Sequence, residues 1–265
     1  MKLLVLAGTR EARALVELLA AEPDIEVIAS LAGRTTSPGP LPCAVRVGGF
    51  GGIDGLHHFL REENVGAVVD GTHPFSARMP HHALAAARRA GVPHLRLRRP
   101  PYQRHPGDDW VEVANMAEAA ATLQHLDARR VLLSVGRLDL EPFSTVPGVH
   151  FVVRSVHAPT QIPPAATVIT ARGPFTVEDE RDLLARHEID TLVTKDSGGD
   201  DAKLEAARVA ALPVVMIRRP PDVAGTTVTE PRVAREWLRS LTQRPPNSTE
   251  DTPTLRSADD TRSRP

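Results

Sequence analysis

The stretch ALPVVMIRRPP, residues 211–221, decides the fold because the chain contains a near copy of it, GVPHLRLRRPP, at residues 91–101. In both copies a proline opens a short apolar run that ends at Arg-Arg-Pro-Pro, and an alanine-rich, helix-like segment comes just before it. Short apolar runs bounded by turn residues are typical of buried strands. The repetition therefore predicts two similar halves, each with one of these strands late in its order.

The repeat extends well upstream of this phrase. VGAVVDGTHPFSARMPHHALAAARRAGVPHLRLRRPP, residues 65–101, aligns with IDTLVTKDSGGDDAKLEAARVAALPVVMIRRPP, residues 189–221, as strand, polar loop, helix and strand. RRVLLSVG at 129–136 likewise matches MKLLVLAG at 1–8. Chance recurrence of such a pattern in an α/β protein is the alternative to duplication.

We expect a first half at residues 1–128 and a second half at residues 129–242, with strand exchange between them left open. Residues 243–265 contain almost no apolar side chains and are predicted to form a disordered tail, because they cannot bury enough apolar surface to fold.

The fold class follows from the alternation of strands and helices. Residues 2–7 form an apolar run, and Ala12, Leu15, Val16 and Leu19 then fall at helical spacing. Similar strand-then-helix units follow along the chain. Continuous apolar strands separated by helices indicate parallel sheets covered on both faces. We predict an α/β protein with two Rossmann-like parallel-sheet domains facing a central cleft.

Composition narrows the possible partners. The formal net charge is −1 and only 3% of the residues are aromatic, so nucleic acid is an unlikely ligand. The single cysteine, Cys43, suits a reducing cytoplasm, and the opening MKLLVLAG is interpreted as a strand rather than a signal peptide. No apolar run is long enough to span a membrane. We expect a monomer in the cytoplasm.

Loops that follow strands are the candidate sites, because ligands of such folds bind at the carboxyl ends of the strands. Gly8, Thr9 and Arg10 open the first helix and predict either a phosphate site or a plain structural turn. After the second strand, basic and hydroxyl residues stand where an NAD site would place an acidic residue, which favours a 2′-phosphate and therefore NADP(H). The residues in this loop are Arg34, Thr35 and Thr36.

The loop VVDGTHPFS offers Gly71 and Thr72 for close backbone approach to a ligand. His73 could face the cleft or could cap the following helix. A metal site is not predicted, because His57-His58 and His81-His82 are adjacent pairs whose side chains point in different directions.

In the second half, Lys195 and Asp196 follow a strand and precede the small-residue turn Ser197–Gly199, which predicts an anion-binding nest. A role for Lys195 and Asp196 in surface salt bridges is the alternative. Arg137 and Arg172 also come just after strands. Such a basic cleft in a nearly neutral protein calls for an acidic ligand.

Seven segments, in this order and spacing, closely resemble the precorrin-6A reductases of cobalamin biosynthesis. They are LAGTREARAL, GGFGGIDGL, VDGTHPFSARM, RLRRPPY, SVGRLDL, TARGPFT and VTKDSGG, and the resemblance covers residues 1–241. It implies NADPH in the first domain, and hydride transfer to a double bond of a polycarboxylate tetrapyrrole bound by the second, giving precorrin-6B. Lys195 and Asp196 are then the catalytic candidates, and the remaining substrate contacts are Ser76, Arg137, Arg172, Ser197, Gly198 and Gly199.

Two other function classes share features with this sequence. A short-chain dehydrogenase needs Tyr-x-x-x-Lys, but the only tyrosine, Tyr102, has Pro106 four residues later, so this class is excluded. A two-lobed binding protein without catalysis would share the cleft but would not need a 2′-phosphate site.

Overall fold

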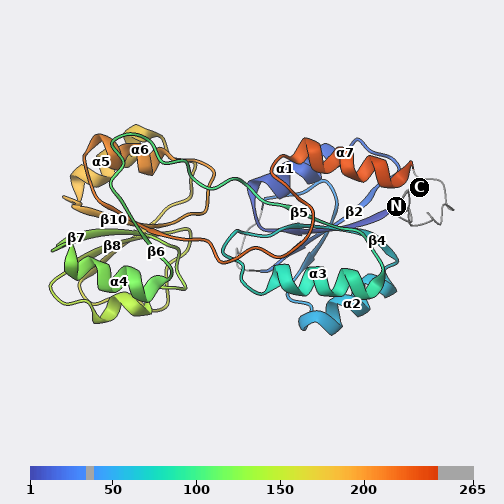
Figure 1. Ribbon diagram of the computed structural model, residues 1–265, viewed down its shortest axis with the longest axis horizontal. Helices are drawn as coiled ribbons and strands as arrows, with labels where there is room; N and C mark the ends of the chain where they lie inside the picture. Colours follow the sequence, from blue (N-terminus) through green and yellow to red (C-terminus); the bar gives the residue numbers. More distant parts are fainter. Residues whose placement is uncertain (34–38, 244–265) are drawn as a thin grey trace, which may run out of the picture.

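The computed structural model describes residues 1–33 and 39–243. Its strands form two separate parallel sheets of six strands each. The sheets lie end to end, with helices on both faces of each (Figure 1). The predicted α/β class with two Rossmann-like parallel sheets is confirmed. No helix in the described ranges is long and apolar enough to cross a membrane.

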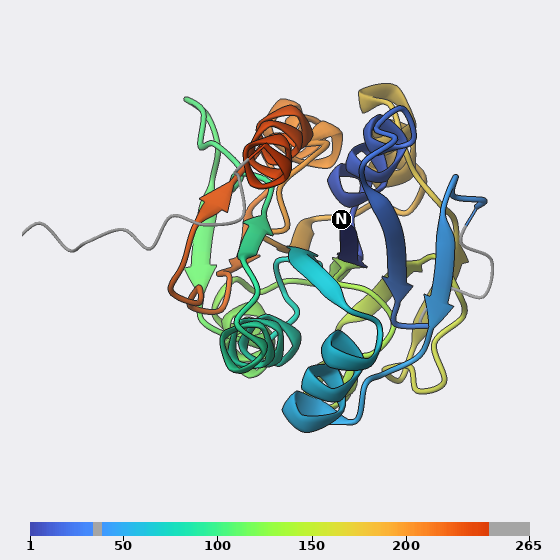
Figure 2. The ribbon, with the colours of Figure 1, turned by 90° about the vertical axis from the view of Figure 1, so that its right-hand side faces the viewer.

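The first sheet has the strand order β12-β5-β4-β1-β2-β3. Helices α1 and α7 cover one face and α2 and α3 cover the other (Figure 2). The predicted apolar positions of α1 are all buried, because its ten residues present Ala12, Leu15, Val16 and Leu19 on one side. The strands are β1 (Lys2–Ala7), β2 (Glu26–Leu31), β3 (Ala44–Val47), β4 (Val65–Gly71), β5 (His94–Leu97) and β12 (Thr227–Val228), and the helices are α1 (Arg10–Leu19), α2 (Gly52–Glu62), α3 (Met79–Ala90) and α7 (Pro231–Thr242).

The second sheet has the order β6-β11-β10-β7-β8-β9. Its strands are β6 (Trp110–Val113), β7 (Arg130–Ser134), β8 (His150–Ser155), β9 (Ala166–Thr170), β10 (Thr191–Lys195) and β11 (Val214–Ile217), and its helices are α4 (Met116–His125), α5 (Val177–Arg186), α6 (Ala202–Val209) and the short 3-10 helix η1 (Glu141–Thr145).

The two strand orders are the same. From β3 to β12 in the first sheet, and from β9 to β6 in the second, the strands follow the 3-2-1-4-5-6 order of dinucleotide-binding folds. Strand 1 of this order is β1 in the first sheet and β7 in the second. The strands that carry the repeated phrase, β5 and β11, both occupy the fifth place. The duplication predicted from that phrase is therefore visible in the topology.

The sixth strand of each sheet comes from the other half of the sequence. After β5 the chain crosses over and adds β6 and α4 to the second sheet; after β11 it crosses back and adds β12 and α7 to the first. Both crossings run between the sheets in Figure 1. We had expected the two halves to divide at residue 128, but the sheets do not divide there. The strands that cross are the ones after the repeated phrase. Local sequence could not reveal this, because β12 has only two residues.

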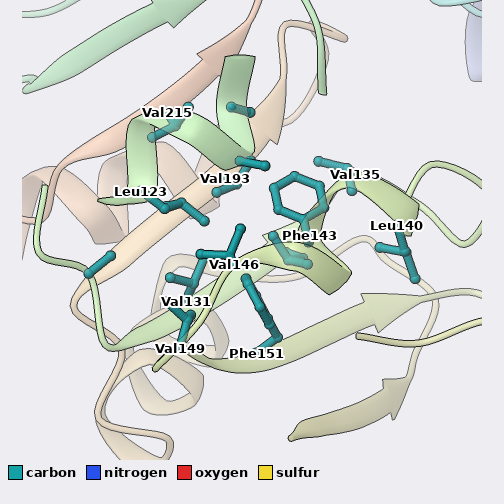
Figure 3. Close-up of a cluster of buried hydrophobic side chains, with 14 of the residues drawn as sticks. Leu123, Val131, Val135, Leu140, Phe143, Val146, Val149, Phe151, Val193 and Val215 are labelled. Atoms are coloured by element: carbon teal, nitrogen blue, oxygen red, sulfur yellow. The ribbon is translucent and has the colours of Figure 1, made fainter. Parts of the chain in front are cut away.

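Each sheet face has its own apolar core. Under α4 and η1, a cluster is built around Phe143 and Phe151, whose rings meet edge to face at 5.9 Å (Figure 3). Phe75, from the loop after β4 of the first sheet, packs against this second-sheet cluster. The carboxyl ends of the two sheets therefore meet, and this region is called the junction below.

Candidate active site

The first half contributes a tight backbone turn where β1 and β4 end side by side. The Gly8 N–H donates to the Gly71 carbonyl at 3.2 Å. A Cβ on Gly8 would lie 3.1 Å from the backbone nitrogen of His73, and a Cβ on Gly71 would lie 2.6 Å from the Cβ of Ala12. The two glycines let the backbones of β1, β4 and α1 approach closely, as phosphate-binding turns of this fold require.

The N-terminus of α1 opens from this turn. Thr9 is its N-cap: the hydroxyl accepts from the Ala12 N–H at 3.2 Å and donates to the Gly71 carbonyl at 3.1 Å. The cap links the helix to the end of β4. The positive end of the helix dipole is thus fixed at the junction, where an anion would be stabilised.

The loop after β4 is held by a buried carboxylate. Asp70, which is fully buried, accepts from the Thr72 N–H at 3.0 Å and the Thr72 hydroxyl at 2.7 Å. His73 Nδ1 accepts from the Phe75 N–H at 3.2 Å, which helps to fix the orientation of the ring. His73 does not cap the next helix, because the N-cap of α3 is Arg78.

Two arginines, Arg96 in β5 and Arg98 just after it, balance the charge beneath this loop. Arg96 Nε lies 3.5 Å from Asp70 Oδ2, and Arg96 also pairs with Asp222, which comes from the crossing between β11 and β12. Arg98 reaches the other oxygen of Asp222 at 2.5 Å. Nearby, burial lowers the pKa of His94 more than the Asp70 carboxylate raises it, so the ring favours its neutral form.

In the second half, Lys195 is the last residue of β10 and lies at the junction. Its Nζ donates to Asp139 Oδ2 at 2.6 Å, and its side chain is only 14% exposed. The same ammonium lies 5.3 Å from the centre of the Phe75 ring, which comes from the first half. Lys195 therefore forms a salt bridge, as the alternative to a catalytic role expected, and its partner is Asp139 rather than the neighbouring Asp196.

Asp196 points to a different set of partners. Its carboxylate accepts from the Tyr102 N–H at 3.0 Å and lies 3.4 Å from Arg219 Nε. Both partners belong to the segments that cross between the sheets. The contacts of Asp196 thus fit a role in fixing these segments rather than contact with a ligand.

The Ser197–Gly199 turn is shaped by the same crossings. Gly198 and Gly199 have φ values of +65° and +86°. A Cβ on Gly198 would lie 2.1 Å from the Pro100 carbonyl oxygen, and one on Gly199 would lie 2.5 Å from Arg99 Nη1. These contacts account for both glycines without the anion nest that the sequence suggested.

The other predicted residues are spread around the junction. Arg10, beside the α1 N-terminus, pairs with Asp200 in the loop after β10 at 2.6 Å. Ser76 follows Phe75, Arg137 follows β7, and Arg172 is an exposed residue after β9. Arg34, Thr35 and Thr36 lie outside the described residues, as does the predicted tail beyond residue 243.

Comparison with known proteins assigns this architecture. The family model described as precorrin-6x reductase CbiJ/CobK matches residues 2–239. The chain belongs to this family. A precorrin-6A reductase of Rhodococcus erythropolis is 46% identical over 248 residues, covering 92% of this chain and 99% of that protein. A cobalt-precorrin-6A reductase of Priestia megaterium is 29% identical, covering 84% and 92%. A solved structure, CobK precorrin-6A reductase, matches with a TM-score of 0.86 and 39% identity over 93% of this chain and 99% of that one.

Membership of the precorrin-6x reductases makes the chain an oxidoreductase of cobalamin biosynthesis, as the sequence motifs had indicated. The alternative of a two-lobed binding protein without catalysis is therefore wrong. Sequence reasoning missed Phe75 and Asp139 as the neighbours of Lys195, and Arg96 and Asp222 beneath the Thr72 loop. The first two lie within quoted motifs, but nothing local in those motifs says which side chains meet across the junction.

Proposed function

We propose that this member of the precorrin-6x reductases uses NADPH to reduce a double bond of the precorrin-6A macrocycle, giving precorrin-6B. One observation carries the proposal: the small-residue turn and helix N-terminus of the first sheet meet Lys195 of the second sheet at a single junction. Phe75 and Arg10 make that meeting direct. One side suits a dinucleotide and the other suits an acidic substrate.

The residues of the first half fit a dinucleotide. Gly8 and Gly71 have no side chains, so they pack closely against their neighbours and do not block α1. A diphosphate would therefore reach the main-chain N–H groups at the start of this helix. Gly8, Thr9 and Arg10 would hold the diphosphate, and Gly71, Thr72 and His73 would border the nicotinamide half. Arg34, Thr35 and Thr36 would bind the 2′-phosphate. When bound, NADPH supplies the hydride.

Arg10 is available for such a contact. Its pairing with Asp200 is solvent-exposed, with 58% and 51% of the two side chains accessible. Exposed ion pairs contribute little to stability. A phosphate could therefore replace Asp200 as the partner of Arg10 at small cost.

The second half supplies cations for a substrate with several carboxylates. Arg137 and Arg172 would bind peripheral carboxylates, with Ser76 and the Ser197–Gly199 turn beside them. Lys195 is the candidate catalytic residue, because Asp139 and Phe75 hold its ammonium where both halves meet. There it would stabilise or protonate the macrocycle as the hydride arrives. Asp196 would act indirectly, by fixing the loop that follows Lys195.

The test is an anaerobic assay of NADPH oxidation with precorrin-6A, with its cobalt form as the second substrate. We expect the metal-free form to react faster, since the relative named for it is 46% identical against 29% for the cobalt enzyme. Binding of NADPH without turnover of either form would overturn the proposed reaction.

The cofactor preference has its own test. Arg34→Ala should weaken NADPH far more than NADH, because a charge-assisted hydrogen bond contributes roughly 1.5–3 kcal/mol. Cofactor fluorescence measures both affinities, and equal weakening of NADPH and NADH would remove the 2′-phosphate assignment.

We also propose that the protein acts as a monomer in the cytoplasm. Sedimentation of the pure protein would check the oligomeric state.

A further inference from the structure

Arg99, in the first crossing, bridges the two halves. Its Nε and Nη2 donate to Glu11 Oε2 at 2.9 and 2.6 Å, and its Nη1 donates to the Gly198 carbonyl at 3.3 Å. Glu11 lies in the first turn of α1, and Gly198 lies in the loop after Lys195. The Arg99 side chain is only 11% exposed, so it ties the first turn of α1 to the loop after β10 away from bulk water.

Arg219, at the equivalent place in the second crossing, completes the arrangement. Its Nε donates to the Asp196 carbonyl at 2.7 Å, and its Nη1 and Nη2 donate to the carbonyls of Arg99 and Pro100 at 2.8 Å each. The backbone of the first crossing is thereby fixed to the loop after β10. We call Glu11, Arg99, Gly198, Asp196 and Arg219 the clasp.

The clasp explains the second arginine of each Arg-Arg-Pro-Pro phrase. Arg99 and Arg219 each use a planar guanidinium to reach several oxygens at once, which a lysine ammonium cannot do in the same geometry. Gly198 and Gly199 are small because Pro100 and Arg99 occupy the space that side chains would need. Both crossings and the Lys195 loop are therefore shaped to fit one another.

We propose that Arg99 is a positioning residue for hydride transfer. It fixes the separation between the N-terminus of α1 and the loop that follows Lys195. This inference rests on the proposed function, which places NADPH at α1 and the substrate at Lys195. The consequence for rate follows from distance: the reacting atoms must come within roughly 3–3.5 Å, and a displacement of about 1 Å can cost about a hundredfold.

The kinetic experiment compares Arg99→Gln and Arg99→Lys with a matched control, Arg239→Gln. Arg239 makes the same kind of bidentate pair, to Glu22 at 2.6 and 3.1 Å, but it joins α7 to the chain after α1, outside the junction. We expect both Arg99 variants to lower kcat about tenfold or more, while the Kd for NADPH stays within about twofold. Arg239→Gln should keep the parent kcat.

A second kinetic readout separates positioning from general stability. With NADPH deuterated at the transferred hydrogen, the isotope effect on kcat should rise in the Arg99 variants, because hydride transfer becomes the slower step. A purely structural role would lower the Tm in both positions and leave kcat and the isotope effect at parent values. That outcome in an active parent would overturn the proposal.

Amide hydrogen exchange provides a measurement independent of turnover. In Arg99→Gln, exchange across residues 195–200 should speed up by about tenfold or more, and it should be unchanged in Arg239→Gln. If Arg99→Gln does not fold, Glu11→Gln is the milder variant and should show the same changes. A parent without reductase activity would reject the proposed function alone. Unchanged exchange at 195–200 would reject the positioning role whatever the activity.

Discussion

Gly71 and Lys195 occupy the same position in the two sheets, yet they have opposite chemistry. Each is the last residue of the strand next to the first strand of its half. At Gly71 the missing side chain lets α1 pack against the strand end, whereas Lys195 projects an ammonium to Asp139 and Phe75. One repeated framework thus ends in closely packed backbone in one half and in a charged side chain in the other.

A second difference follows the first strand of each half. The ten-residue helix α1 follows β1, but only the five-residue 3-10 helix η1 follows β7. A full helix N-terminus suits a phosphate, and a short 3-10 turn does not provide the same dipole. This difference supports the proposal that a dinucleotide binds in the first half and that side-chain cations of the second half recognise the substrate.

The largest effect is expected from Gly198→Ala, compared with Gly136→Ala in the same half. Both glycines have positive φ, but only Gly198 has atoms close to where a Cβ would be. Gly198→Ala should lower the free energy of unfolding by roughly 2–5 kcal/mol, from backbone strain plus the clash with Pro100, and Gly136→Ala by roughly 1–2 kcal/mol. Urea unfolding measures both. Equal losses would show that the turn after Lys195 is not shaped by the crossing.

Lys195→Met tests the charged half of the comparison. Turnover should fall about tenfold or more, equivalent to roughly 1.4 kcal/mol in the barrier, with NADPH affinity unchanged. Lys2→Met is the control, since Lys2 bonds Glu63 at the amino end of the first sheet. Steady-state kinetics of the two variants would contradict the assignment if Lys195→Met reduced substrate at the parent rate or no longer bound NADPH.

Thr9→Ala and Asn115→Ala compare the cap of the helix proposed to bind the dinucleotide with the cap of a helix on the second sheet. Thr9 caps α1 and Asn115 caps α4, each through a side chain that accepts a backbone N–H. Each loss should destabilise the protein by about 1 kcal/mol. Only Thr9→Ala should also weaken NADPH, by roughly 3- to 10-fold, because Thr9 also bonds Gly71. Similar NADPH titrations for both variants would argue against a dinucleotide site at α1.

The smallest effect concerns pH and His94, whose counterpart at the start of β11 is Val214. Burial lowers the pKa of His94 in the folded protein. The unfolded chain binds a proton at about pH 6.5 while the folded one resists it, so this contribution to stability is present above that pH and is lost as the pH falls. His94→Val should flatten the decline in unfolding free energy between about pH 7 and pH 5. If the unfolding free energy of His94→Val declines with falling pH as steeply as that of the parent, the decline is due to other groups.

Much of the fold was predictable because it is local. The burial of Leu15 and Leu19 follows from helical spacing, and the equivalence of β5 and β11 follows from a repeated phrase. The reciprocal exchange was not predictable, because β12 is too short to show a pattern. Lys195 could be found by its place after a strand, but its partner Asp139 could not, since only the fold brings the two together. Asp196 and the paired glycines suggested a ligand site, whereas their neighbours are the crossings.

The exchange of sixth strands also dictates an order of events during synthesis. The cluster beneath α1 includes Ala234 and Leu238 of α7, so the first sheet keeps an apolar face and an open edge until β12 and α7 have left the ribosome. An exposed strand edge invites pairing with other chains. The sheet that begins first is therefore completed last, after every strand of the second sheet has been synthesised.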